Sequence, residues 1–100
     1  MLSRAENDRR NLVGCVIEQA IIKAGGNKML YDILCFLYTN YSCYAADCLD
    51  NPQYLVNALK EHDVKYSRIV VSSITSELEE FSYHKPIKDF VVRLDKFRDC

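Results

Sequence analysis

The feature that most constrains the fold is the recurrence of apolar residues at helical spacing along most of the chain. In the clearest segment the spacing is i, i+3, i+4, i+7, i+8 and i+11, at Leu30, Ile33, Leu34, Leu37, Tyr38 and Tyr41. Because an α-helix turns every 3.6 residues, this spacing collects all six side chains on one side of a helix. No alternating strand pattern of useful length competes with it. The sequence therefore predicts an all-α fold.

Five segments of this kind predict a compact bundle of about five helices in one domain over residues 1–100. Gly25-Gly26 ends the first helix because glycine readily adopts the left-handed cap conformation, and so short a connection predicts that the first two helices form an antiparallel hairpin. Asp50-Asn51-Pro52 and Pro86 are start signals for later helices. For residues 42–51, an extension of the second helix and a loop with a short turn both remain open. The expected helices are 6–24, 28–41, 52–62, 64–82 and 86–98.

The last two helices each carry an apolar stripe that we expect to face the core. For residues 64–82 the inward set is Tyr66, Ile69, Val70, Ile74, Leu78 and Phe81. For residues 86–98 it is Ile87, Phe90, Val91, Leu94 and Phe97. In the helix 28–41, Tyr31, Cys35 and Phe36 extend the apolar surface around the cylinder, which is typical of a central helix with neighbours on more than one side.

Charge and hydropathy limit the classes of partner. The chain has 13 basic and 14 acidic residues, a net charge of −1, so nucleic acid is not favoured as a partner. The charged first ten residues do not form a secretory signal. The longest apolar run, residues 33–38, is far shorter than the ~20 residues that cross a bilayer. We therefore expect no membrane association and a cytoplasmic location.

The five cysteines do not form a recognisable chemical site. Their odd number argues against a closed disulfide framework and predicts free thiols. Cys43 and Cys48 form a C-x4-C pair, but a zinc site needs four convergent ligands, and His62 and His84 stand 22 residues apart. The sequence therefore predicts no catalytic residue, no cofactor and no metal. A thiol- or metal-dependent enzyme remains an alternative.

Surplus apolar residues give the better functional hint. Leu12, Cys15 and Ile22 lie roughly opposite the main stripe of the helix 6–24, and Phe36 lies off the stripe of the helix 28–41. One interpretation is that neighbouring helices cover both helices on two sides. The other is that these four residues form an exposed patch that binds another protein or a second copy of the chain.

The segment from Asp50 to Leu78 carries a resemblance to a known family. The run Asp-Asn-Pro-Gln-Tyr-Leu-Val-Asn-Ala-Leu, followed by Tyr66, Ile74 and Leu78, is similar to a small all-helical output-domain family of archaeal signalling proteins. The resemblance implies a signalling or regulatory role without known catalytic residues. We therefore expect a cytosolic regulatory or protein-interaction domain. A small helical DNA-binding regulator remains the alternative from another class.

Overall fold

The computed structural model describes residues 4–96, and it is all-helical over that range, as the periodicity predicts. Its α-helices are α1 (Arg4–Tyr41), α2 (Pro52–His62), α3 (Val64–Leu78) and α4 (Lys85–Asp95). Two short 3-10 helices, η1 (Ala45–Leu49) and η2 (Glu79–Phe81), lie in the connections. The described part of the chain therefore has four α-helices instead of the expected five.

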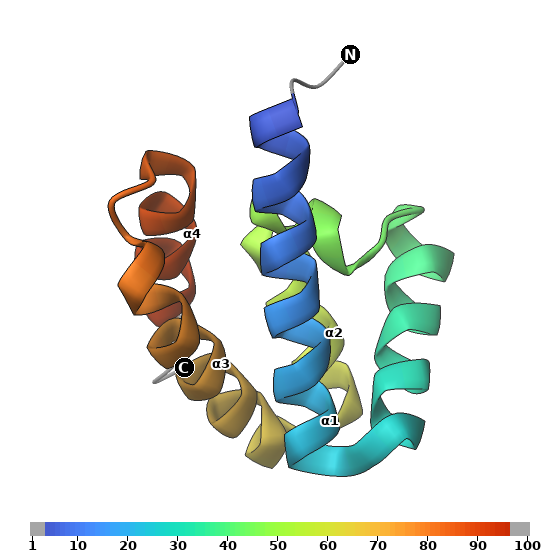
Figure 1. The fold of residues 1–100 in the computed structure, drawn as a ribbon. Helices are drawn as coiled ribbons and strands as arrows, with labels where there is room; N and C mark the ends of the chain where they lie inside the picture. The colour runs from blue at the N-terminus through green and yellow to red at the C-terminus, as the bar shows by residue number, and fades with distance from the viewer. Residues whose placement is uncertain (1–3, 97–100) are drawn as a thin grey trace.

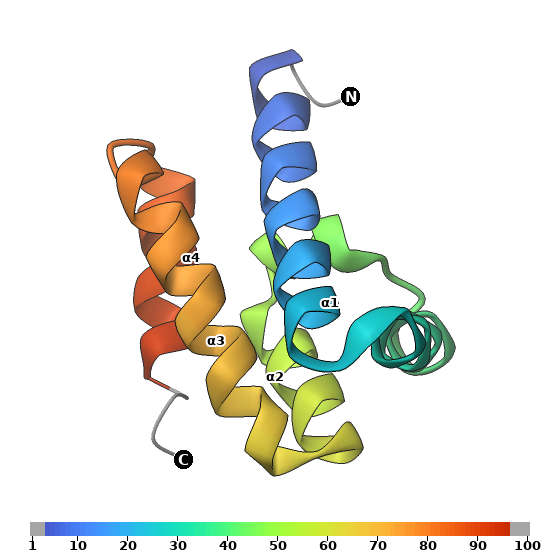
Figure 2. The ribbon, with the colours of Figure 1, turned by 60° about the horizontal axis from the view of Figure 1, so that its bottom comes forward.

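The difference in number arises at Gly26, where α1 bends without ending. Gly26 has φ 82° and ψ −177°, a combination that only glycine adopts readily because a Cβ atom would strain the backbone. We call residues 4–25 the first arm of α1 and residues 27–41 its second arm. The two arms run side by side in Figure 1, but in Figure 2 the second arm is seen end-on while the first still runs down the view. The arms therefore cross at an angle, and the expected antiparallel hairpin is not confirmed.

Both views place α3 and α4 on one side of the first arm and the second arm on the other (Figures 1 and 2). The second arm thus lies at the edge of the molecule, not at its centre as its all-round apolar surface predicts. No helix within residues 4–96 has both the length and the apolar character needed to span a membrane.

The connection that the sequence left open, residues 42–51, folds back against the first arm. Ser42 leaves the helix with a positive φ of 53°, and η1 follows. Arg10 lies within 3.8 Å of Asp47 and also donates a hydrogen bond to Asp50. A Cβ atom built on Gly14 would lie 3.2 Å from the Cβ of Ala46. Glycine at this position therefore permits the close approach of η1 to α1.

The later helices begin close to their predicted starts. The bounds of α2 are those predicted, with Pro52 in its first turn. Asp63 separates α2 from α3, and its carboxylate accepts a hydrogen bond of 2.9 Å from the backbone nitrogen of Lys65. α3 ends at Leu78, four residues before its expected end, because the chain tightens into η2. The last expected residues of α4, including Phe97, lie outside the described part of the chain.

The core gathers one apolar face from each helix. Its largest fully buried side chains are Ile17, Ile21, Met29, Ile33, Leu37, Leu55, Leu59, Ile74, Leu78, Ile87, Phe90 and Leu94. Two residues of the predicted apolar faces are exposed: Ile69 is 50% exposed, whereas Val71 is buried, and Tyr38 is 59% exposed. The buried side chains of α3 share one face of the helix, and the middle of that face lies between the directions of Val70 and Val71. Ile69 points to nearly the opposite side of the helix.

Candidate interaction surface

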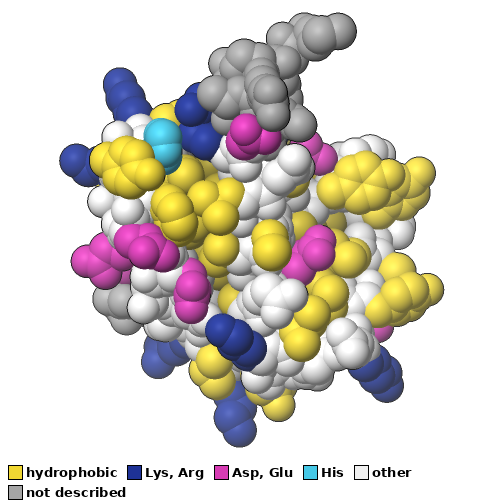
Figure 3. Space-filling view, in the orientation of Figure 1, with side chains coloured by type: hydrophobic (Ala, Val, Ile, Leu, Met, Phe, Trp, Pro, Cys, Tyr) yellow, Lys and Arg dark blue, Asp and Glu magenta, His cyan; other side chains and the backbone are white. Residues whose placement is uncertain are grey.

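The outer face of the second arm carries a row of exposed aromatic side chains. Tyr31, Cys35 and Tyr38 stand at i, i+4 and i+7, so they share one face of the helix. Tyr31 is 69% exposed, Tyr38 is 59% exposed, and Tyr44 in the following loop is 65% exposed. We call these four residues the tyrosine stripe. Figure 3 shows apolar side chains on the side of the molecule where the second arm lies, and further apolar side chains on the other half of the same face.

Contacts within the stripe order its side chains. The rings of Tyr38 and Tyr44 lie 5.9 Å apart, centroid to centroid, in a tilted arrangement. The Tyr31 side chain shares a hydrogen bond with Cys35, and this contact raises the pKa of the tyrosine hydroxyl. Tyr31 and Tyr38 therefore each have a neighbour within the stripe, which reduces the rotamer freedom that a partner would have to restrict.

A second group of aromatic side chains fixes the arm to the body. The rings of Tyr41 and Tyr54 stack with centroids 4.0 Å apart and an interplanar angle of 5°. Phe36 meets Tyr41 edge-on at 6.1 Å. The Asn57 side-chain nitrogen donates to the Tyr41 hydroxyl at 3.0 Å. These contacts join the second arm to α2, so the stripe is held on a supported element.

The sequence did not reveal this support, because Tyr41 and Tyr54 lie on different helices and only the fold brings them together. The sequence does indicate, in contrast, that the helix with Tyr31 and Tyr38 keeps some apolar side chains exposed. Its apolar residues exceed what one buried face can hold.

The structure does not gather the four predicted partner-binding residues into one patch. Cys15 is exposed and lines a shallow groove of about 160 Å³ between the first arm and α3. Leu12 and Phe36 are half-buried and pack against the core, and Ile22 is also half-buried. Phe36 belongs to the second arm, on the other side of the first arm from that groove (Figure 1). A role in partner binding stays a prediction for each residue.

The C-x4-C pair lies inside the protein. Cys43 and Cys48 are both free and buried, and their side chains form a hydrogen bond with each other. Burial raises the pKa of Cys43 and raises that of Cys48 to about 12. Both shifts disfavour the thiolate, which is the form of cysteine that acts as a nucleophile or a metal ligand.

The histidines offer little for metal chemistry. His62 Nδ1 lies 3.9 Å from an Asp32 carboxylate oxygen, a contact between α2 and the second arm. Among the described residues there is no group of three or more histidine, cysteine or acidic side chains placed to hold a metal ion.

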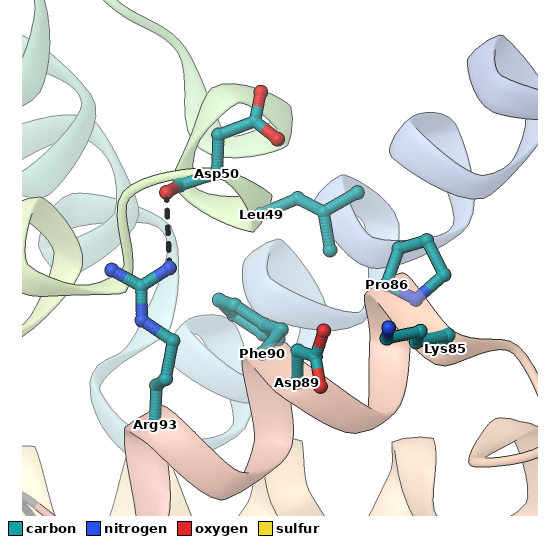
Figure 4. Close-up of a pocket in the computed structure, with 7 residues that line it drawn as sticks. All are labelled: Leu49, Asp50, Lys85, Pro86, Asp89, Phe90 and Arg93. Atoms are coloured by element: carbon teal, nitrogen blue, oxygen red, sulfur yellow. Dashed lines mark hydrogen bonds between the residues drawn. The ribbon is translucent and has the colours of Figure 1, made fainter.

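A cleft of about 310 Å³ opens between η1 and α4 (Figure 4). The Arg93 guanidinium donates to the backbone oxygen of Asp50 at 3.3 Å across it, while the Asp50 carboxylate points away from the arginine. Lys85 and Asp89 add one charge of each sign. Its lining residues are Leu49, Asp50, Lys85, Pro86, Asp89, Phe90 and Arg93, which include no histidine, cysteine or hydroxyl nucleophile.

Comparisons of this chain with protein families, with curated proteins and with solved structures found no match.

Proposed function

We propose that this chain is a cytosolic regulatory domain that works by binding another protein chain through the tyrosine stripe, without catalysis. One observation carries the proposal: three tyrosines, each more than half exposed, line one face of a supported helical arm and its adjoining loop. Tyrosine is enriched in protein interfaces because its ring supplies a large contact area and its hydroxyl remains able to hydrogen-bond. Large exposed apolar side chains gathered on one face commonly mark a binding site.

A signalling output role agrees with this surface and with the resemblance of residues 50–78 to archaeal output domains. Such a domain needs a stable body and a face for its partner, and it needs no active site. Within residues 4–96, no observation favours a DNA-binding regulator or a thiol- or metal-dependent enzyme. The charged residues on the exposed side of α4, Lys88 and Asp89 among them, alternate in sign and do not form a phosphate-binding face.

The test compares two tyrosine substitutions of equal chemistry. Tyr38→Glu places a charge in the stripe, while Tyr83→Glu places one at a residue that is 75% exposed between η2 and α4. This connection lies on the opposite side of the molecule from the second arm (Figure 1). Each purified variant is immobilised, after circular dichroism has verified its fold, and challenged with extract from native cells.

We expect wild type and Tyr83→Glu to retain a protein that Tyr38→Glu loses, because a buried unpaired carboxylate opposes association. The retained proteins are quantified by mass spectrometry. If all of them bind Tyr38→Glu as strongly as wild type, the stripe is not the interaction surface.

A further inference from the structure

We propose that Cys43 and Cys48 are a redox modification site, at which a low-molecular-weight disulfide such as glutathione disulfide oxidises the folded protein to a reversible Cys43–Cys48 disulfide. The inference is independent of the proposed function, because it concerns a buried thiol pair and not the exposed stripe. Three observations support it: the contact between the two thiols, the anchoring of the segment that carries them, and the separation of the other described cysteines.

The fold brings the two thiols into contact. Cys43 follows the end of α1, and Cys48 lies in η1, five positions later in the chain. The positive φ of Ser42 turns the chain and η1 winds it tightly, so both side chains are buried and hydrogen-bond to each other. Two cysteines can be bridged only where their side chains point toward each other, and this pair meets that condition.

The segment between the two cysteines is anchored on the first arm. Arg10 lies within 3.8 Å of Asp47 in η1, and Gly14 permits the close approach of Ala46. These contacts hold the backbone between the sulfur atoms in one path. The folded protein therefore gives the two thiols a higher effective concentration toward each other than the unfolded chain does.

The other two described cysteines are not placed to compete for this pairing. Cys15 lines the groove between the first arm and α3. Cys35 belongs to the second arm, which lies on the other side of the first arm (Figure 1). Cys100 lies outside the described part of the chain. Among the described cysteines, the fold therefore favours a bridge between Cys43 and Cys48.

The exchange proceeds in two steps, and burial sets their order. Cys43 is 7% exposed while Cys48 is fully buried, so the oxidant reaches Cys43 first. The Cys43 thiolate attacks one sulfur of glutathione disulfide, which forms a mixed disulfide and releases one glutathione thiolate. The Cys48 thiolate then attacks the Cys43 sulfur and releases the second glutathione. The protein loses two electrons and two protons, and glutathione disulfide is reduced to two molecules of glutathione.

Burial also sets the rate of the exchange. It raises the pKa of both thiols, that of Cys48 to about 12, so the attacking thiolate is scarce at neutral pH. We therefore expect slow oxidation that becomes faster as the pH rises, and a position of equilibrium that the contact between the thiols determines.

Thermal unfolding of the full chain tests whether the fold accommodates the disulfide. A variant with Cys15→Ser, Cys35→Ser and Cys100→Ser retains only Cys43 and Cys48, and it is oxidised in urea, refolded and purified as the monomer. The oxidised protein should melt at a temperature roughly 5–15 °C above that of the reduced protein, because the bridge restricts the unfolded chain. An equal or lower melting temperature would overturn the inference.

Peptide mapping of wild type tests the pairing without any substitution. The protein is equilibrated in mixtures of glutathione and glutathione disulfide, from both the reduced and the oxidised state, so that slow access does not imitate absence of a bridge. Chymotrypsin cleaves after Tyr41, Tyr44 and Leu49, so the bridge leaves residues 42–44 joined to residues 45–49. We expect this linked peptide to form with an equilibrium constant at least about tenfold larger in the folded protein than in urea.

Two matched variants test the order of the steps. Cys48→Ala should stop at the mixed disulfide of Cys43 with glutathione, whereas Cys43→Ala should leave Cys48 a free thiol under the same conditions. Mixed disulfides confined to Cys15 and Cys35 in wild type, or a linked peptide that forms no more readily in the folded protein than in urea, would overturn the assignment of the buried pair.

Discussion

Replacement of Gly26 by alanine isolates the free-energy cost of the bend in α1. At φ 82° and ψ −177° an L-residue is strained by its own backbone. Apart from the two neighbouring residues and the backbone of the helix itself, no heavy atom lies within 4 Å of a Cβ built at this position. The new methyl group therefore meets no side chain, and the change in stability reports backbone strain alone.

The expected loss follows from two opposing terms. Strain in this region costs roughly 1–3 kcal/mol. Alanine also restricts the unfolded chain, which offsets about 0.4–1 kcal/mol of that cost. We expect Gly26→Ala to lower the free energy of unfolding by about 1–2 kcal/mol, which corresponds to a melting temperature lower by roughly 5–15 °C. Urea unfolding followed by circular dichroism measures the change, with Lys28→Ala as an exposed neighbouring control.

Gly26→Asn distinguishes the observed conformation from an ordinary left-handed cap. Asparagine tolerates the left-handed helical region, where ψ is near +47°, but a ψ of −177° lies far outside it. Asparagine should therefore be about as destabilising as alanine. A loss below about 0.5 kcal/mol for Gly26→Ala, or near-complete retention of stability by Gly26→Asn, would refute this account of the bend.

Three further predictions concern the core and its thiols. Phe90→Ala should lower the free energy of unfolding by about 3–5 kcal/mol, because the ring is 1% exposed. Val92→Ala, on the exposed side of α4, should lower it by under ~1 kcal/mol. Equal losses of the two variants in urea unfolding would show that α4 is not docked. Gly14→Val should destabilise by about 1–3 kcal/mol, because its side chain would press on Ala46, and a neutral result in the same assay would contradict the close approach of η1. The Cys48 thiol should make stability fall between about pH 9 and 12: its pKa is 9.0 ordinarily and about 12 in the folded protein, so the unfolded chain releases the proton first as pH rises. Unfolding measured at both ends of this range should show a smaller decrease for Cys48→Ala, and an identical decrease would exclude Cys48 as the cause.

Local features were sufficient for much of the helical architecture. Pro52 after Asp50-Asn51 marked the start of α2 to the residue, and the stripe of Ile87, Phe90 and Leu94 marked the buried face of α4. Both signals act over one or two turns of helix, so they do not depend on the rest of the fold. The candidate site was less accessible: the sequence showed that residues 28–41 carry more apolar surface than one face can bury, but not which face stays in water.

The sequence by itself determined that the chain is helical, that glycine interrupts the first long helix, and which face of α4 is buried, because periodicity and backbone preference are local properties. Only the tertiary structure decided that the interruption is a bend at Gly26, that the second arm lies at the edge, and that Tyr31 and Tyr38 remain exposed. Those outcomes depend on φ and ψ of Gly26, because these two angles set the direction of the following helix. They also depend on contacts between distant residues, such as the stacking of Tyr41 on Tyr54. Helical spacing records which residues share a face, whereas the direction of the chain after Gly26 determines what that face meets.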